Sequence, residues 1–390
     1  LVPALDAAKL DDFFLFVGND NDFVTQNGFQ VGQAYSDASG VENDTMLLAY
    51  RLTLPTYVDP LATESQALTG PAIGQALGES ALAATAAASA DLTGRTQAIR
   101  AGMANRAEGS FEMAAGGNWG ALARDDQDGK RLSKPESWSA GIAGDYAVSG
   151  TVRIGLALNY ADTDGRFGNL GGAKVTAWGI GPYATLSLPG GLYADASYRY
   201  TDLKIEDIRR NTFAYGLTAN GGTEAKGHHV GVEFGSVATA GSLRYGPIVS
   251  FNYDRVELDA WNETGALHLN LDHADLAEQQ LLFNIGGQVS TSIDLGEGRV
   301  AVPELRLGYQ EDLIKDDGQT YTTVLSNRRD SALARNTTIL PDPQGDGFRV
   351  GLGLSLSVAD NAGLYLSGDT LFVEDGKPDY TLGAGLRVGF

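Results

Sequence analysis

The feature that most constrains the fold is a period of two in the hydrophobicity of residues 110–390. In residues 151–161, Ile154 lies on an apolar face, while Arg153 and Asn159 lie on the opposite face. Side chains alternate between two faces in this way along a β-strand. Twelve runs show the pattern: 112–123, 138–148, 151–161, 174–188, 192–200, 228–237, 243–253, 283–295, 300–310, 348–359, 364–373 and 379–390.

The gaps between these runs alternate between tight turns and longer or more polar segments. Ser149-Gly150 and Gly296-Glu297-Gly298 are tight, whereas 201–227 and 311–347 are long. An even number of strands with short turns at one rim and long loops at the other is typical of a transmembrane β-barrel. The sequence therefore predicts an all-β fold, a 12-stranded antiparallel transmembrane β-barrel, with both barrel ends at the periplasmic rim. A soluble all-β domain shows the same period and is the alternative.

The distribution of charged and aromatic residues favours the membrane interpretation. Charges on one strand face suit a wet lumen, and we expect them to line the pore rather than to bind a substrate. The luminal candidates are Arg153, Arg199, Glu233, Glu304, Arg306, Arg349 and Arg387. Aromatic residues near strand ends resemble interfacial girdles. They include Trp138, Tyr146, Tyr160, Trp178, Tyr200, Tyr253, Tyr309, Phe348 and Tyr380.

Composition excludes several other classes of protein. The chain has 28 basic and 49 acidic side chains and a net charge of −21, so nucleic acid is not an expected partner. It has no cysteine, which excludes disulfides and thiolate metal sites. No stretch reaches the roughly 18 apolar residues of a membrane-spanning helix. The 51 glycines imply many turns or close backbone contacts.

Residues 61–109 form a linker with an alanine-rich segment, for which we predict a helix from about Ile73 to Ile99. The lumen of a 12-stranded barrel has room for roughly one slim helix. We therefore expect this helix to lie in the lumen, where it could approach the wall on every side. A solvent-exposed linker helix is the alternative. The pore-helix candidates are Ala83, Ala84, Ala86, Ala87 and Ala88.

Residues 1–60 are acidic and contain two apolar runs, Phe13–Val17 and 46–54, which we predict to be strands. Two strands cannot make a domain by themselves, so the chain is interpreted as the C-terminal part of a longer precursor. Acidic residues between the two runs could bind Ca²⁺, because this ion prefers hard oxygen ligands. Capping of turns by their side chains is the alternative role. The candidate metal ligands are Asp20, Asp22, Glu42 and Asp44.

The C-terminal strand carries the most specific resemblance. Apolar alternation that ends on Phe390 resembles the assembly signal of Gram-negative outer-membrane proteins, and an alanine-rich helix followed by twelve strands resembles the translocator of a type V autotransporter. Residues 245–259 (YGPIVSFNYDRVELD), with Trp261 and Glu263, are similar to the seventh-strand segment of esterase-type autotransporters. The assembly-signal candidates are Tyr380, Leu382, Leu386, Val388 and Phe390, although Val388 stands where an aromatic residue is common.

The N-terminal segment resembles another family. Residues 14–23 (FLFVGNDNDF), 43–45 (NDT) and 50–55 (YRLTLP) are similar to the last blade of "esterase-like activity of phytase" domains. This resemblance implies that residues 1–60 are the C-terminal remnant of a propeller-like passenger domain with hydrolase activity, most of which lies upstream of Leu1. Ca²⁺, for which the oxygen ligands named above are the candidates, would be a cofactor of this passenger.

We find no catalytic motif in the chain itself: HExxH, G-x-S-x-G and the P-loop are all missing from the sequence. The barrel is therefore expected to need no cofactor. The resemblance implies a protein inserted in the Gram-negative outer-membrane lipid by the assembly machinery, with periplasmic chaperones as partners. It would translocate its own N-terminal passenger and anchor it at the cell surface. Two alternatives remain: part of a surface-displayed esterase or phosphatase with catalytic residues upstream, and an adhesin-like binding protein.

Overall fold

The structure is a computed structural model of the 390-residue chain. It describes residues 13–17, 46–51, 70–102, 108–121, 133–212, 217–314, 320–326, 335–340, 346–359, 361–373 and 378–390.

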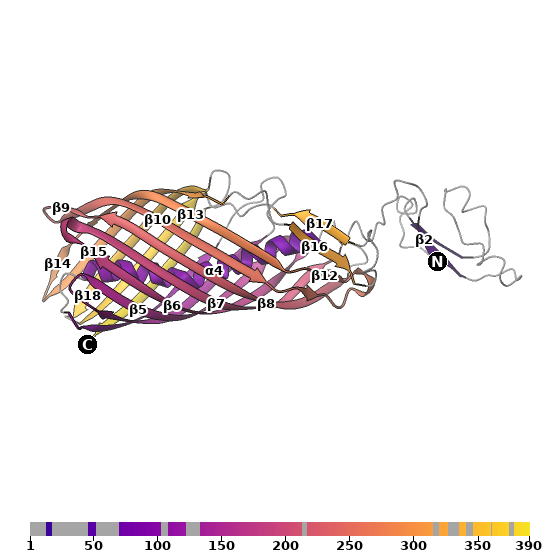
Figure 1. The fold of residues 1–390 in the computed structure, drawn as a ribbon, viewed down its shortest axis with the longest axis horizontal. Coiled ribbons are helices and arrows are strands. Elements are labelled where there is room, and N and C mark those ends of the chain that lie inside the picture. Colours follow the sequence, from indigo (N-terminus) through magenta and orange to yellow (C-terminus); the bar gives the residue numbers. More distant parts are fainter. Residues whose placement is uncertain are drawn as a thin grey trace, which may run out of the picture.

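Within these residues, twelve long strands form one closed antiparallel barrel (Figure 1). Neighbours in sequence pair with one another, β13 pairs with β15, and the ring closes where β20 pairs with β3. The prediction of a 12-stranded antiparallel barrel is confirmed. The strands are β3 (Phe111–Ala121), β4 (Lys134–Ala147), β5 (Val152–Arg166), β6 (Gly171–Ser187), β7 (Leu192–Asn211), β8 (Thr218–Ser236), β10 (Leu243–Leu258), β13 (Leu276–Thr291), β15 (Arg299–Asp312), β18 (Gly347–Ala359), β19 (Ala362–Phe372) and β20 (Asp379–Gly389).

Shorter strands lie at both rims of the barrel. At the rim with tight turns, called the short-turn rim below, β9 (Ala238–Ala240) pairs with β10 and β14 (Ile293–Gly296) pairs with β15. At the opposite, long-loop rim, a separate four-stranded sheet has the order β11-β12-β16-β17. Its strands are β11 (Trp261–Asn262), β12 (Leu271–His273), β16 (Thr320–Leu325) and β17 (Arg335–Ile339).

The other strands and the 3-10 turns are short. The strands β1 (Phe13–Val17) and β2 (Met46–Arg51) pair antiparallel, and both lie within the apolar runs from which they were predicted. Three 3-10 turns lie at the rims: η4 (Gly168–Leu170), η5 (Pro189–Gly191) and η6 (Leu267–Leu269).

Along each barrel strand, side chains point alternately to the outer face and to the lumen. Ile154, Leu156 and Leu158 on β5 are about half exposed on the outer face, whereas Arg153 and Ala157 are fully buried inside. Apolar side chains on an outer face and polar ones on the inner face are what a barrel wall in lipid requires.

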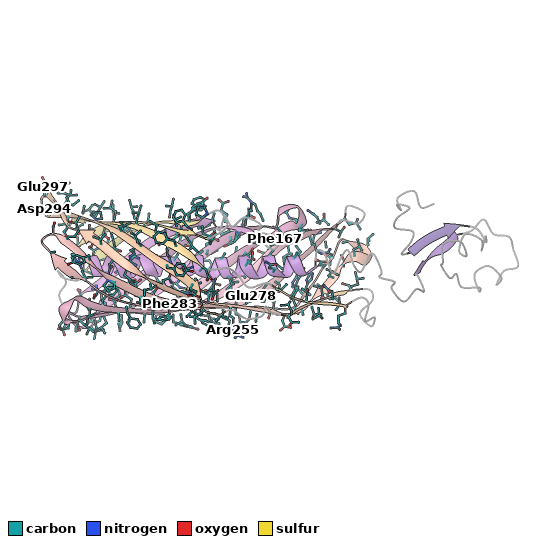
Figure 2. All side chains as sticks on the ribbon, turned by 90° about the horizontal axis from the view of Figure 1, so that it is seen from above. Phe167, Arg255, Glu278, Phe283, Asp294 and Glu297 are labelled. Carbon is teal, nitrogen blue, oxygen red and sulfur yellow. The ribbon has the colours of Figure 1, made fainter. Side chains whose placement is uncertain are left out.

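Aromatic rings mark the two edges of the apolar outer face. Towards the long-loop rim, the ring centroids of Trp138 and Tyr160 are 5.3 Å apart, and those of Tyr160 and Trp178 are 5.0 Å apart. At the short-turn rim, the ring centroids of Phe111 and Phe390 are 6.3 Å apart. Asp294 and Glu297 lie at this same end (Figure 2).

Several strands continue far past the aromatic edge at the long-loop rim, which corrects the prediction of a long loop at 201–227. On β7, Leu203 and Ile205 are buried inside, while Asp202 and Lys204 point outward. The alternation is inverted because water rather than lipid surrounds this part of the wall. Outward charges resemble loop residues in the sequence, although the period of two persists.

One long helix, α4 (Gly70–Gly102), runs along the inside of the barrel (Figure 1). Its 33 residues span about 50 Å, and it extends beyond the predicted 73–99 at both ends. Pro71 lies in the first turn, where its missing N–H costs nothing. Among the described helices, none is long and apolar enough to cross a membrane.

Candidate functional site

The occupied lumen is the candidate site, and α4 packs mainly against β4, β5 and β6. Small residues on both partners permit this contact. The side chain of Ser80 lies where a Cβ on Gly165 would stand, and Thr85 lies likewise against Gly227. Any side chain at these two wall positions would push the helix away.

Several polar side chains of the helix are satisfied within the helix itself. The hydroxyl groups of Ser80, Thr85 and Ser89 donate to the carbonyl oxygens four residues earlier, at 2.7, 3.0 and 3.0 Å. This pattern allows hydroxyl groups on a buried helix face without leaving donors unpaired. From the wall, Asn159 donates to the carbonyl oxygen of Ala88.

The alanine face is not in contact with the wall on every side, which corrects the expectation. Ala83, Ala84 and Ala88 are buried, but Ala86 is exposed and Ala87 is half-buried. The helix packs most closely against β4, β5 and β6, and a cavity lies beside Ala86 and Ala87. Ion pairs at one end and packing under the four-stranded sheet at the other hold it there.

A cluster of buried charges fixes the helix near the short-turn rim. The Arg95 guanidinium on α4 donates to Glu112 on β3 at 2.8 Å and to Asp145 on β4, with Nε 3.0 Å from Asp145 Oδ2. All three side chains are at most 2% exposed. Removing one partner from such a buried pair leaves an uncompensated charge and costs about 3–5 kcal/mol.

Residues of the wall complete this cluster. Arg153 lies 3.1 Å from Asp145 and 3.4 Å from Glu112, and Arg387 lies 3.3 Å from Glu112. The Tyr183 hydroxyl donates to Asp145 at 2.7 Å. Strands β3, β4, β5, β6 and β20 therefore meet around one helix residue.

The structure also places the other luminal candidates in ion pairs or hydrogen bonds of the wall. Arg199 donates to Asn159, which places it beside the helix. Arg306 pairs with Glu304 and lies 3.3 Å from Glu233. Further along the wall, Arg349 pairs with Asp369 at 3.0 Å.

A second polar network lies at the long-loop rim, beyond the aromatic edge. Arg210 donates two hydrogen bonds to Glu263, at 2.7 and 2.6 Å. His273 Nε2 lies 3.1 Å from Glu263, and His273 Nδ1 lies 2.7 Å from the Tyr321 hydroxyl. The His273 ring stacks on Trp261 with a centroid distance of 3.9 Å. These five residues form the cap network.

The cap network touches the first turns of the helix. A Cβ on Gly74 would collide with the Tyr321 ring, and one on Gly78 would meet Glu278. Ile73 and Leu77 belong to the same buried cluster as Trp261 and Tyr321. The helix is therefore held under the four-stranded sheet at this end.

Burial sets the protonation of the cap network. Burial lowers the pKa of His273, and the opposing contact with Glu263 does not restore it, so the imidazole is neutral at pH 7. Burial alone would raise the pKa of Glu263, but hydrogen bonds from Arg210 and His273 lower it to about 2. Arg210 and Asp272 are the other charged groups near the imidazole.

We expect acid to loosen the cap. A histidine with a lowered pKa takes up a proton on opening, so its contribution is lost as the pH falls below about 6.5. Amides of β12 and β16 should therefore exchange faster at pH 5 than at pH 7 after correction for intrinsic rates. In H273Q this difference should largely vanish, and equal protection of the unmodified protein at both pH values would contradict the interpretation.

The C-terminal strand closes the ring. The Phe390 amide donates to the carbonyl oxygen of Phe111 at 2.9 Å, and the Tyr380 ring lies 5.3 Å from Trp119. Leu382 and Leu386 are exposed on the outer face, and Val388 shares their side of the strand.

The predicted Ca²⁺ ligands Asp20, Asp22, Glu42 and Asp44 lie outside the described residues. Within the described part of the chain, no group of three or more His, Asp or Glu side chains is placed to hold a metal ion.

Comparison with known families decides the identity of the fold. Residues 111–369 match the family described as "Autotransporter beta-domain". The chain belongs to this family. It is an outer-membrane β-barrel of type V secretion, with its passenger at the surface of a Gram-negative cell. No curated protein matches the chain significantly.

Two solved autotransporter structures share the fold. The translocator domain of autotransporter NalP from Neisseria meningitidis has a TM-score of 0.56 and 16% identity, over 78% of this chain and 96% of that chain. The β domain of the Bordetella autotransporter Brka has a TM-score of 0.52 and 16% identity, over 73% of this chain and 100% of that chain.

Sequence reasoning missed the residues that fix the helix. Arg95 is a large cation in a segment of mostly small residues, which is a usable signal. Its partners Glu112 and Asp145 could not be identified from spacing, because only barrel closure brings them together.

Proposed function

We propose that α4 is the end of the exported polypeptide and that it stays in the lumen as a plug after export. The observation that supports this most strongly is the buried contact of Arg95 with Glu112 and Asp145, which fixes a helix continuous with the N-terminal segment inside the barrel. The chain enters the helix at the long-loop rim and leaves it at the short-turn rim, where β3 begins.

Epitope insertion tests this orientation. An epitope between β16 and β17, at residues 327–334, should be reachable by antibody on intact cells, because the two flanking strands lie at the long-loop rim. An epitope at Gly296-Glu297-Gly298 should be reached only after the outer membrane is permeabilised. The two insertions are matched controls for each other, and reversed accessibility would overturn the orientation.

We further propose that residues 1–60 are the tail of an esterase-like phytase passenger, supported by the residues 14–23, 43–45 and 50–55. The barrel itself carries no chemistry under this proposal. The C-terminal strand would be the segment that the assembly machinery binds after periplasmic chaperones deliver the chain. Its apolar outer face and terminal aromatic residue support that role.

A further inference from the structure

A buried histidine–carboxylate pair lies on the inner face of the wall, apart from the ion pairs that hold the helix. His229 on β8 is 8% exposed and Asp254 on β10 is 5% exposed, and His229 Nδ1 lies 2.9 Å from Asp254 Oδ1. Because an ionised carboxylate only accepts hydrogen bonds, Nδ1 carries the proton and the neutral imidazole keeps a lone pair on Nε2. Among the described residues, none forms a hydrogen bond with this Nε2. The pair therefore has the arrangement of an oriented general base.

A serine hydroxyl lies close to this nitrogen. A Cβ on Gly231 would stand 2.8 Å from Ser197 Oγ and 3.1 Å from His229 Nε2. Asn252 Oδ1 lies 3.2 Å from the same point. Strand pairing sets this arrangement, because Gly231 is opposite Ser197 on β7 and Asn252 on β10. A nucleophile and a base are thus within reach of one reacting atom, and the hydrogen bond between such groups often tightens only when substrate binds.

Gly231 also lines a cavity of about 380 Å³ between the wall and α4. This volume lies within the range of pockets for small organic ligands, about 300–1,000 Å³. Apolar side chains line part of it, among them Ala86 on the helix and Ile248 on the wall. The lining reaches Ala121 and Asp379 at the long-loop ends of β3 and β20. The space suits a small, largely apolar molecule with one polar group.

We propose that the barrel hydrolyses small esters at this site, with Ser197 as the nucleophile, His229 as the general base and Asp254 as the residue that orients the imidazole. Ser197 Oγ attacks the carbonyl carbon of the ester, and His229 Nε2 accepts the hydroxyl proton. The bond to the alcohol oxygen breaks, and the alcohol leaves with that proton. Water, deprotonated by the same nitrogen, then releases the acid and restores the serine.

Asn252 has a place in the same step. A half-turn of its carboxamide presents Nδ2 instead of Oδ1 to the point above Gly231. A side-chain amide in that position can donate to the carbonyl oxygen as negative charge develops on it. Asn252→Ala should therefore lower kcat about 100-fold.

This inference goes beyond the proposed function, which needs no chemistry in the barrel. Ser197, His229 and Asp254 all belong to strands of the wall. The site is therefore independent of the claim that the helix remains as a plug, and failure of one does not imply failure of the other. No sequence motif indicates the site, because its residues come from three strands and meet only through their pairing.

The test is covalent labelling of the folded full chain with phenylmethanesulfonyl fluoride, followed by mass spectrometry. The serine oxygen bonds to sulfur and fluoride leaves, so we expect the label on Ser197 and a parallel loss of p-nitrophenyl acetate hydrolysis. His229→Gln should slow both reactions about 100-fold or more, since a positioned base contributes that much. His228→Gln, on the outer face of the same strand, and Ser367→Ala on β19 are the matched controls and should leave both rates unchanged.

The role of Asp254 needs a separate measurement. If it orients the imidazole, Asp254→Asn should lower kcat more than about tenfold and leave KM nearly unchanged, because the wrong nitrogen would carry the proton. A rise in KM with an unchanged kcat would contradict this role.

The labelling result decides the proposal. Absence of label on Ser197 in a chain that shows heat-modifiable gel mobility would overturn it, as would equal hydrolysis by Ser197→Ala. Labelling of other serines at the same rate would also overturn it. If a variant does not fold, the labelling of the unmodified chain still decides.

Discussion

Removal of residues 73–100 is expected to convert the barrel into an open pore with a large, sustained conductance. Barrels of eight strands are filled by side chains and those of sixteen hold aqueous channels, so twelve strands without the helix leave an open lumen. The wall keeps its own hydrogen bonds between strands and should still fold. Planar-bilayer recordings of the full and shortened chains measure the difference.

The control for this deletion is a scrambled 73–100 segment of equal composition, which keeps the chain length and lacks the placement of Arg95. Equal conductance of the full and shortened chains would show that the segment is an ordinary linker.

Arg95→Met is expected to release the short-turn end of α4. The substitution leaves Glu112 and Asp145 to the wall arginines Arg153 and Arg387, and breaking such a buried contact costs about 3 kcal/mol. Local opening of the last helical turns then becomes easier by this free energy. The amides of these turns should therefore exchange with solvent about two orders of magnitude faster.

Arg349→Met is the matched control, because Arg349 pairs with Asp369 on the wall. A double-mutant cycle of Arg95→Met with Asp145→Asn should give a coupling of about 1–3 kcal/mol. Unchanged protection of the helix in Arg95→Met would show that packing alone holds it.

The barrel was predictable because every strand that crosses the lipid needs apolar side chains on its outer face and can carry polar or small ones on its inner face. In residues 151–161 and 348–359, apolar and polar or small residues alternate regularly, and the structure places both runs in strands. The same reasoning predicts strands at 192–200 and 228–237 that are much shorter than the observed β7 and β8. Beyond the aromatic edge the apolar residues point inward, as Leu203 and Ile205 do, so the outward charges resemble those of loops.

The site was less predictable for a different reason. Arg153 and Arg387 could be assigned to the lumen from alternation, but their convergence on Glu112 depends on the pairing of β3 with both β4 and β20. Likewise Glu263 lies 53 residues after Arg210 and 10 residues before His273, and the three side chains meet only in the folded cap.

Closure of the barrel in the membrane can be tested most directly by gel mobility with and without boiling. Barrels closed by hydrogen bonds resist SDS until they are heated, so unheated and boiled samples should migrate at different positions. A chain that lacks residues 379–390 cannot close and should migrate at one position in both states. Identical mobility of the full chain, together with solubility in buffer without detergent, would contradict a closed outer-membrane barrel.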